Sequence, residues 1–299
     1  MKILIGVDGS ASSLDAVRLV ARLVDPAADA IAVYFSPLEL EKRLPGRPRR
    51  IVEGAAAALF EEACSLLPGG FVQPIEMIAS SKSAAVGLLE SAAEWRADII
   101  VVGARGHGSV ERFLLGSVSR AVVHGAGLPV LIARGAPSAD RGPKVLVCHR
   151  PASAGAVAAT MGMLHWPTST AGSVIGVTES MLAGPLPAWL EKQVRDPDTA
   201  AIALAWQHEH DEEVAAIGGS LATFQTTLPL PFRSLAPIVA EGNPAEQILA
   251  RAKHDGSDLI VVGRTPSDML TRWLLGSTSE AVLTHAAASV LVIPVEKRA

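Results

Sequence analysis

The stretch Asp98-Ile99-Ile100-Val101-Val102-Gly103 recurs 160 residues later as Asp258-Leu259-Ile260-Val261-Val262-Gly263. An uninterrupted apolar run between a polar residue and a glycine is typical of a strand buried on both faces of a parallel sheet. At the same interval, Leu114-Leu115-Gly116-Ser117 recurs as Leu274-Leu275-Gly276-Ser277. The chain therefore contains two copies of one pattern.

The beginnings of the two copies also match, at a shorter interval. Lys2-Ile3-Leu4-Ile5 corresponds to Lys144-Val145-Leu146-Val147, which lies 142 residues later. The intervals of 160 and 142 differ by 18, so the second copy carries about 18 additional residues. A proline-containing connection at residues 181–198 accounts for much of them. We predict two domains, residues 1–135 and residues 143–299, joined by a hinge rich in Pro, Gly and small polar residues.

Each copy alternates short β-branched runs with longer amphipathic stretches, which predicts right-handed βαβ units in a doubly wound α/β fold. We therefore expect two tandem parallel sheets with helices on both faces. In the first copy, the expected strands lie near residues 2–7, 30–35, 71–79, 98–103 and 128–133, and the expected helices near residues 11–24, 51–66, 83–96 and 117–125.

Composition narrows the class of protein. The chain has 299 residues, of which 49% are hydrophobic and 19% are charged, a profile that can bury a core and is far from disordered. Its net charge of −4 gives no reason to expect nucleic acid. We find no apolar stretch long enough to span a membrane or to act as a signal peptide, and Cys64 and Cys148 form no disulfide framework. The expected location is the cytoplasm.

A glycine-rich segment follows the fourth predicted strand of the first copy. Gly103-Ala104-Arg105-Gly106 is separated by nine residues from Gly116-Ser117, which opens a predicted helix. Glycines in such a loop allow positive φ and close backbone approach, and loop N–H groups together with a helix N-terminus bind phosphate. The alternative is structural, because a tight turn also needs glycine and Ser117 can simply cap its helix.

A second polar segment, Asp8-Gly9-Ser10, closes the first strand. Its structural interpretation is a turn in which Ser10 caps the helix that begins at Ala11. Its functional interpretation is that Asp8 faces a ribose or a bound magnesium ion. Open α/β sheets bind ligands beyond the carboxyl ends of their strands, and both Asp8 and Gly103 follow such ends.

These segments together resemble the universal stress protein family. The resemblance rests on the Gly-x2-Gly-x9-Gly-Ser spacing, the opening Ile5-Gly6-Val7-Asp8-Gly9-Ser10 and the closing strand Leu128-Pro129-Val130-Leu131-Ile132. It covers nearly the whole chain, twice. It implies five-stranded parallel sheets of order 3-2-1-4-5, and it implies ATP binding for members with the complete glycine motif.

The resemblance also implies roles for individual residues of the first copy. Asp8 would meet the ribose or a Mg ion, and Val7 and Val102 would flank the adenosine. Tyr34 or Phe35 would offer backbone groups to the adenine. The remaining residues would contact ribose and phosphates: Gly103, Gly106, Gly116, Ser117, Val118 and Ser119.

The second copy departs from this pattern. Arg150 and Pro151 stand where the first copy has Asp8 and Gly9, and Pro266 stands where it has Gly106. The surviving Gly263, Gly276 and Ser277 have a structural explanation, since Ser277 and Glu280 fit a capping box. We therefore expect ATP in the first domain only, although Arg150 could turn the second site toward another anion.

Three functions remain open: a nucleotide-dependent regulatory switch with an unknown protein partner, an enzyme such as a slow ATPase, or a scaffold without nucleotide. The sequence has no Gly-Lys-Ser/Thr phosphate loop and no nucleophile elbow, so we expect no enzyme beyond weak ATP hydrolysis. The basic loop containing Lys42, Arg47 and Arg50 is a further candidate for the phosphate tail. We expect an intramolecular pseudo-dimer through the last strands, Leu128–Ile132 and Ser289–Ile293, and a homodimer of whole chains is possible.

Overall fold

The computed structural model describes residues 1–43, 45–106, 115–135, 138, 140–178, 197–264 and 276–295. The first copy holds β1 (Lys2–Gly6), α1 (Ala11–Val20), β2 (Ala30–Phe35), α2 (Pro37–Arg43), α3 (Arg49–Ser65), β3 (Glu76–Ala79), α4 (Ala84–Trp95), β4 (Ile99–Gly103), α5 (Ser117–Gly125) and β5 (Val130–Ala133). The second holds β6 (Lys144–His149), η1 (Pro151–Ser153), α6 (Ala154–Met163), β7 (Ala171–Thr178), α8 (Pro197–Thr227), η2 (Leu230–Phe232), β8 (Ile238–Glu241), α9 (Pro244–Asp255), β9 (Leu259–Arg264), α10 (Ser277–His285) and β10 (Ser289–Pro294).

Most predicted elements are present, with two differences in the first copy. The third strand is confined to Glu76–Ala79, much shorter than the predicted 71–79. The basic segment that contains Lys42 and Arg50 is predicted as a loop, but it is largely helical. Helix α2 extends to Arg43, and α3 begins at Arg49. The inserted segment 181–198 lies almost entirely outside the described residues.

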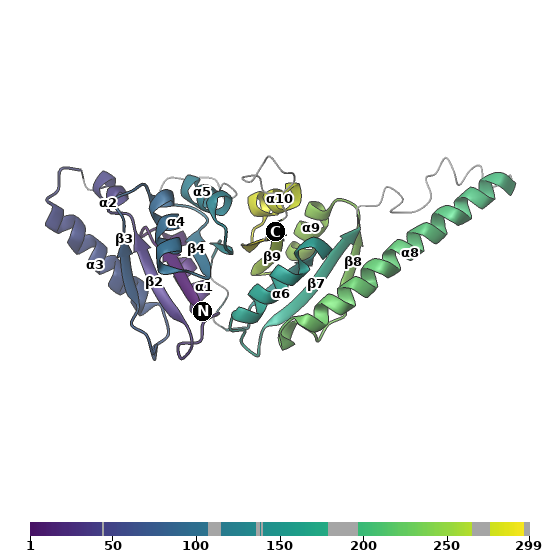
Figure 1. The fold of residues 1–299 in the computed structure, drawn as a ribbon, viewed down its shortest axis with the longest axis horizontal. Helices are drawn as coiled ribbons and strands as arrows, with labels where there is room; N and C mark the ends of the chain where they lie inside the picture. The colour runs from purple at the N-terminus through teal and green to yellow at the C-terminus, as the bar shows by residue number, and fades with distance from the viewer. Residues whose placement is uncertain are drawn as a thin grey trace.

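The ten strands form one continuous sheet of order β3-β2-β1-β4-β5-β10-β9-β6-β7-β8. Each copy contributes the expected order 3-2-1-4-5 with parallel pairing. The two expected five-stranded parallel sheets are joined edge to edge into one, because β5 and β10 pair in antiparallel register with Leu131 opposite Leu291. The predicted association of the last strands is thereby confirmed, and it joins the halves at the centre of the molecule (Figure 1). Pairing removes two apolar edges that would otherwise be exposed.

Alternating side chains divide each central strand between two hydrophobic layers, as strand geometry requires. In β1, Ile3 and Ile5 face one layer and Leu4 faces the other. Helices α1, α3, α6 and α8 contribute to the first layer, and α4, α5, α9 and α10 to the second. Helices therefore cover both faces of the sheet, which leaves the carboxyl ends of its strands as the place for a site.

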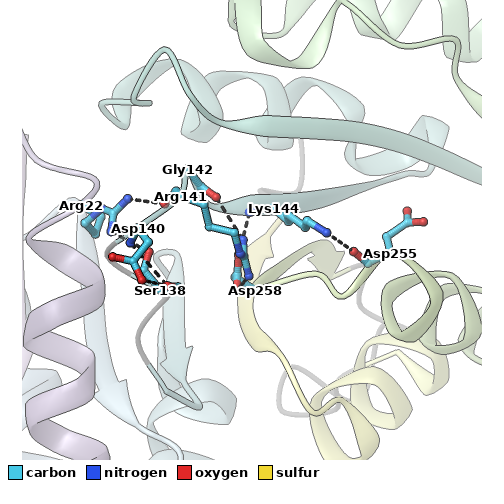
Figure 2. Close-up of polar contacts among 8 residues, drawn as sticks. All are labelled: Arg22, Ser138, Asp140, Arg141, Gly142, Lys144, Asp255 and Asp258. Carbon is cyan, nitrogen blue, oxygen red and sulfur yellow. Dashed lines mark hydrogen bonds and ion pairs between the residues drawn. The ribbon is translucent and has the colours of Figure 1, made fainter.

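The link between the copies is tied to both of them (Figure 2). Arg22, just after α1, donates to the carbonyl oxygens of Ser138 and Arg141 at 3.1 and 2.8 Å. The Arg141 guanidinium binds both carboxylate oxygens of Asp258 at 2.6 and 2.8 Å. Asp258 also accepts from the backbone N–H of Lys144, as Asp98 does from Lys2 in the first copy. The two copies thus repeat this contact as well as the sequence.

Helix α8 is the main departure from internal symmetry. It has 31 residues, against 17 in α3, the corresponding helix of the first copy. Its C-terminal part buries Leu221 and Phe224 against the sheet, as does Leu228 directly after it, and its N-terminal part extends past the edge of the sheet (Figure 1). None of the helices among the described residues combines the length and apolar character needed to cross a bilayer.

Candidate functional site

The candidate site of the first copy lies where the order of the strands in its sheet reverses. β1 pairs with β2 on one side and with β4 on the other, so the connections after β1 and β4 diverge and leave a crevice. A cavity of about 620 Å³ occupies this position, within the range of small-molecule sites. Nine of the ten predicted site residues line it: Val7, Asp8, Val102, Gly103, Gly106, Gly116, Ser117, Val118 and Ser119.

The turn after β1 fixes the Asp8 carboxylate. Gly9 has a φ of +78°, a conformation that favours glycine, and this reverses the chain. Ser10 then caps α1 by accepting from the backbone N–H of Ser13 at 3.2 Å, so the predicted cap is confirmed. Asp8 Oδ1 accepts from the Ser10 backbone N–H at 2.9 Å and from its hydroxyl at 2.6 Å. The structural interpretation of this segment is therefore confirmed, and the functional interpretation of Asp8 stays a prediction.

Gly103, which ends β4, and Gly106, just after it, allow neighbouring groups to approach closely and do not adopt positive φ angles. A Cβ on Gly103 would lie 2.6 Å from the carbonyl carbon of Ser12, and one on Gly106 would lie 2.9 Å from Asp8 Oδ2. Gly9 is among the glycines with positive φ, whereas Gly103 and Gly106 are not, so that part of the sequence interpretation is wrong. Because neither glycine has a side chain, β4 packs on α1 and the loop approaches Asp8.

The far end of the glycine motif returns to the same place. The Gly116 N–H donates to the Ala104 carbonyl at 2.8 Å, and the Ser119 hydroxyl donates to the Gly103 carbonyl at 2.7 Å. Residues 107–114, which include His107, lie outside the described residues. The two described ends of the motif therefore meet in space although nine residues separate them.

Helix α5 presents its N-terminus to this cavity. Its N-cap is Gly116, which makes no side-chain capping bond, so Ser117 is the first helical residue rather than the cap. The first N–H groups of any helix lack intrahelical acceptors and carry a partial positive charge, which suits an anion. Arg105 and Lys42 also line the cavity, although Lys42 lies 2.6 Å from Glu39 in an exposed ion pair. This end of the cavity suits phosphate.

Another part of the cavity lining is mainly apolar. Leu88 and Ala84 from α4 line it together with Tyr34 from β2. Burial raises the pKa of Tyr34, so its hydroxyl remains protonated. Ser36 and Ser80 lie nearby and oppose that rise, but no hydrogen bond of acceptable geometry reaches the Tyr34 hydroxyl within the described part of the chain.

The side chain of Phe35 is not part of this cavity. It is buried in the opposite layer, where its ring packs edge-on against Phe60 at 6.4 Å. Successive strand residues point to opposite faces, so Tyr34 and Phe35 cannot both face the site. The side chain that lines the cavity is therefore that of Tyr34, and only backbone groups of Phe35 remain available for the predicted role. Sequence reasoning also missed Leu88 and Ala84, whose apolar helical spacing resembles that of any core-facing helix.

The second copy has a smaller cavity at the equivalent place, of about 310 Å³. Arg150 and Pro151 line it, together with His149, which stands where the first copy has Val7. The His149 ring lies against Phe224 with 4.7 Å between centroids, and its Nε2 is 2.9 Å from the Ser220 hydroxyl of α8. Burial lowers the pKa of His149, which favours the neutral ring. Helix α8 thus contributes Glu213, Ile217 and Ser220 to the lining of the second cavity.

One detail of the second site differs from the sequence prediction. The N-cap of α10 is Gly276 without a side-chain capping bond, so the predicted capping box of Ser277 and Glu280 is wrong. Glu280 instead faces Arg120 of the first copy at 3.3 Å. Pro266 lies outside the described residues, so its predicted effect stays a prediction.

Metal ligation by protein side chains alone has little support. Within the described ranges, no three His, Cys, Asp or Glu side chains gather in a way that could hold a metal ion. Asp8 and Glu39 supply the carboxylates that line the cavity within the described part of the chain. That arrangement fits Mg²⁺, which is commonly held by one or two carboxylates together with substrate phosphates and water.

Comparison with known proteins points to one family. The model of the Universal stress protein family matches residues 1–134 and 184–294. A universal stress protein of Mycolicibacterium smegmatis is 26% identical over 298 residues, covering 97% of this chain and 96% of that protein. A universal stress protein of Mycobacterium tuberculosis is 27% identical over 201 residues, covering 66% of this chain and 61% of its own length.

Solved structures show the same architecture. A universal stress protein from Archaeoglobus fulgidus aligns with a TM-score of 0.58 at 17% identity, covering 99% of this chain and 98% of that one. A putative universal stress protein from Pseudomonas aeruginosa aligns with a TM-score of 0.58 at 16% identity, covering 98% and 92%. At these identities the likeness concerns the fold.

Proposed function

Because the chain belongs to the universal stress protein family, we propose that its first copy binds ATP with Mg²⁺ and acts as a nucleotide-dependent switch in a stress response. The observation that carries this proposal is the convergence of both ends of the glycine motif with Asp8 around one cavity. A solitary glycine turn needs no such cavity, whereas a nucleotide needs an apolar slot, a polar middle and an electropositive end in one place.

The proposed orientation follows from the lining. The base lies at the apolar end, between Val7 and Val102 and beside Tyr34. The phosphates lie at the α5 N-terminus, where backbone N–H groups of residues 117–119 complement their charge. Asp8 meets the ribose or, through the phosphates, the metal ion, which supplies charge neutralisation when bound. The contacts of Asp8 Oδ1 with Ser10 hold the carboxylate in place for either task.

A switch is favoured over efficient turnover. Hydrolysis requires a positioned base and a group that stabilises the transferring phosphoryl. Of the carboxylates that line the cavity within the described ranges, Asp8 is bound to Ser10 and Glu39 is paired with Lys42. We therefore propose at most slow ATP hydrolysis, with the signal passed through the surface to a protein partner.

The second copy is proposed to lack nucleotide. Its cavity has half the volume, and the His149 ring fills the position of Val7. Arg150 replaces the carboxylate, and a cation repels a metal ion at close range. Pro151 cannot adopt the positive φ of Gly9, and the chain enters a short 3₁₀ turn instead.

The test is calorimetric titration of the intact chain with ATP in the presence and absence of Mg²⁺. We expect one ATP per chain, loss of binding in Gly106→Pro because the loop N–H is removed, and a weakening in Asp8→Ala that is larger with Mg²⁺. Arg150→Ala is the matched control in the second copy and should leave the affinity unchanged. Two equivalent ATP per chain, or wild-type affinity in Gly106→Pro, would refute the proposed site. Absence of ATP binding together with no nucleotide released from freshly purified protein would favour the scaffold function.

A further inference from the structure

Resting on the proposed function, we propose that Arg264 of the second copy is a positioning residue for the nucleotide site of the first. It holds helix α5, whose opposite end forms the phosphate-binding part of the cavity. The copy that has a degenerate motif would then contribute to binding without holding a ligand of its own.

Arg264 crosses from one copy to the other. It ends β9, directly after Gly263, and is 8% exposed. Its Nη1 donates to the carbonyl of Val123 at 2.9 Å and to that of Ala126 at 3.4 Å, and its Nη2 donates to the carbonyl of His124 at 3.4 Å. The last carbonyls of a helix lack intrahelical donors and carry a partial negative charge, so a buried guanidinium satisfies both their hydrogen bonding and their charge.

Arg264 occupies the position in the second copy that corresponds to a residue of the glycine motif in the first. It lies 160 residues after Ala104, which in the first copy is the second residue of the glycine motif. Ala104 is buried, and its carbonyl accepts from the N–H of Gly116, the N-cap of α5, which lines the proposed nucleotide cavity. The second copy thus has a long cation where the first has a methyl group, and this cation is aimed at the other copy.

A second contact holds the middle of α5. Glu280 occupies in α10 the position that Arg120 occupies in α5, 160 residues earlier. Its carboxylate faces Arg120 Nη1 at 3.3 Å and His124 Nε2 at 3.4 Å. These groups are partly exposed, so the pair is weaker than the Arg264 contact, but it acts on the same helix. Helix α5 has only nine residues, so anchoring its C-terminal half also fixes its N-terminus in the cavity.

The molecule contains a natural control for this contact. Arg134, which follows β5, donates to the carbonyls of Leu283 and of Ala286, the latter at 2.8 Å. These carbonyls lie 160 residues after those of Val123 and Ala126, so the two arginines bind equivalent acceptors. Arg134, however, holds α10 of the second copy. Loss of either arginine should weaken the interface between copies, but only loss of Arg264 should release α5.

The experiment compares Arg264→Lys with Arg134→Lys in the full chain. Lysine lacks the planar guanidinium that donates to several carbonyls at once. It keeps the positive charge, so the electrostatic interaction between Arg134 and Arg105, which lines the cavity, is retained in the control. Amide hydrogen exchange without nucleotide reports on α5 and α10, and calorimetry reports the ATP affinity. We expect faster exchange at the C-terminal turn of α5 and about 3- to 10-fold weaker ATP binding in Arg264→Lys. We expect faster exchange in α10 and an affinity within about 2-fold of wild type in Arg134→Lys.

Each result decides the matter. Equal losses of ATP affinity in the two variants, or wild-type exchange of α5 in Arg264→Lys, would overturn the positioning role. If the wild type itself binds no ATP, the proposed function fails, while the exchange data still show whether Arg264 holds α5. If Arg264→Lys does not fold, Glu280→Gln takes its place, with the same signs and smaller effects expected because its partners are partly exposed.

Discussion

The close packing of β4 on α1 predicts a large effect from a single methyl group. In Gly103→Ala, the new Cβ would lie 2.6 and 2.7 Å from the carbonyl carbon and oxygen of Ser12 and 2.7 Å from the backbone nitrogen of Ser13. All three are backbone atoms of the first turn of α1, so no side-chain rotation relieves the clash. Helix α1 must move, and such overpacking costs about 1–3 kcal/mol.

Urea denaturation followed by circular dichroism measures this loss, and each kcal/mol should also lower the Tm by about 2 to 4 °C. Gly127→Ala is the matched control, because a Cβ there meets nothing within 4 Å. The shift of α1 should also weaken ATP binding, since Ser10 at its start holds the Asp8 carboxylate. A urea midpoint for Gly103→Ala equal to that of wild type and of the control would refute the packing argument.

Three further predictions concern stability and reactivity. Asp258→Ala should lower the free energy of unfolding by about 1–3 kcal/mol and more than Asp98→Ala does, because Asp258 accepts from Arg141 as well as from the strand N–H; equal urea midpoints would contradict this. Burial lowers the pKa of His149 in the folded protein below its ordinary value of 6.5. The unfolded chain therefore takes up a proton on His149 at a higher pH than the folded protein does. The free energy of unfolding should accordingly decrease as the pH falls from above 6.5 toward the folded pKa. Denaturation at about pH 8 and about pH 5.5 should therefore show a smaller acid loss in His149→Val than in wild type, and identical losses would exclude the effect. Cys148 is buried and burial raises its pKa, whereas Cys64 is partly exposed, so a thiol reagent should modify Cys64 first in the native protein; fast labelling of both thiols would contradict the described core.

The sequence by itself determined the two copies, most of the strands that form them and the location of the first candidate site. Runs such as Ile99–Val102 are apolar throughout, and that pattern suits a strand covered on both faces. Gly9 and Ser10 specify their turn and cap through local geometry, so the structure places them as predicted. The resemblance to a family with the same glycine spacing added the strand order, which no local pattern contains.

Tertiary structure decided what depends on register and on contacts between distant residues. The alternation along β2 assigns Tyr34 to the cavity and Phe35 to the opposite layer, and one residue of difference in register reverses that assignment. Glu280 fits a capping pattern in its own helix, yet it binds Arg120 from the other copy. Arg264 has no local signal at all, because its acceptors lie about 140 residues earlier in the chain and reach it only when β5 and β10 join the two sheets.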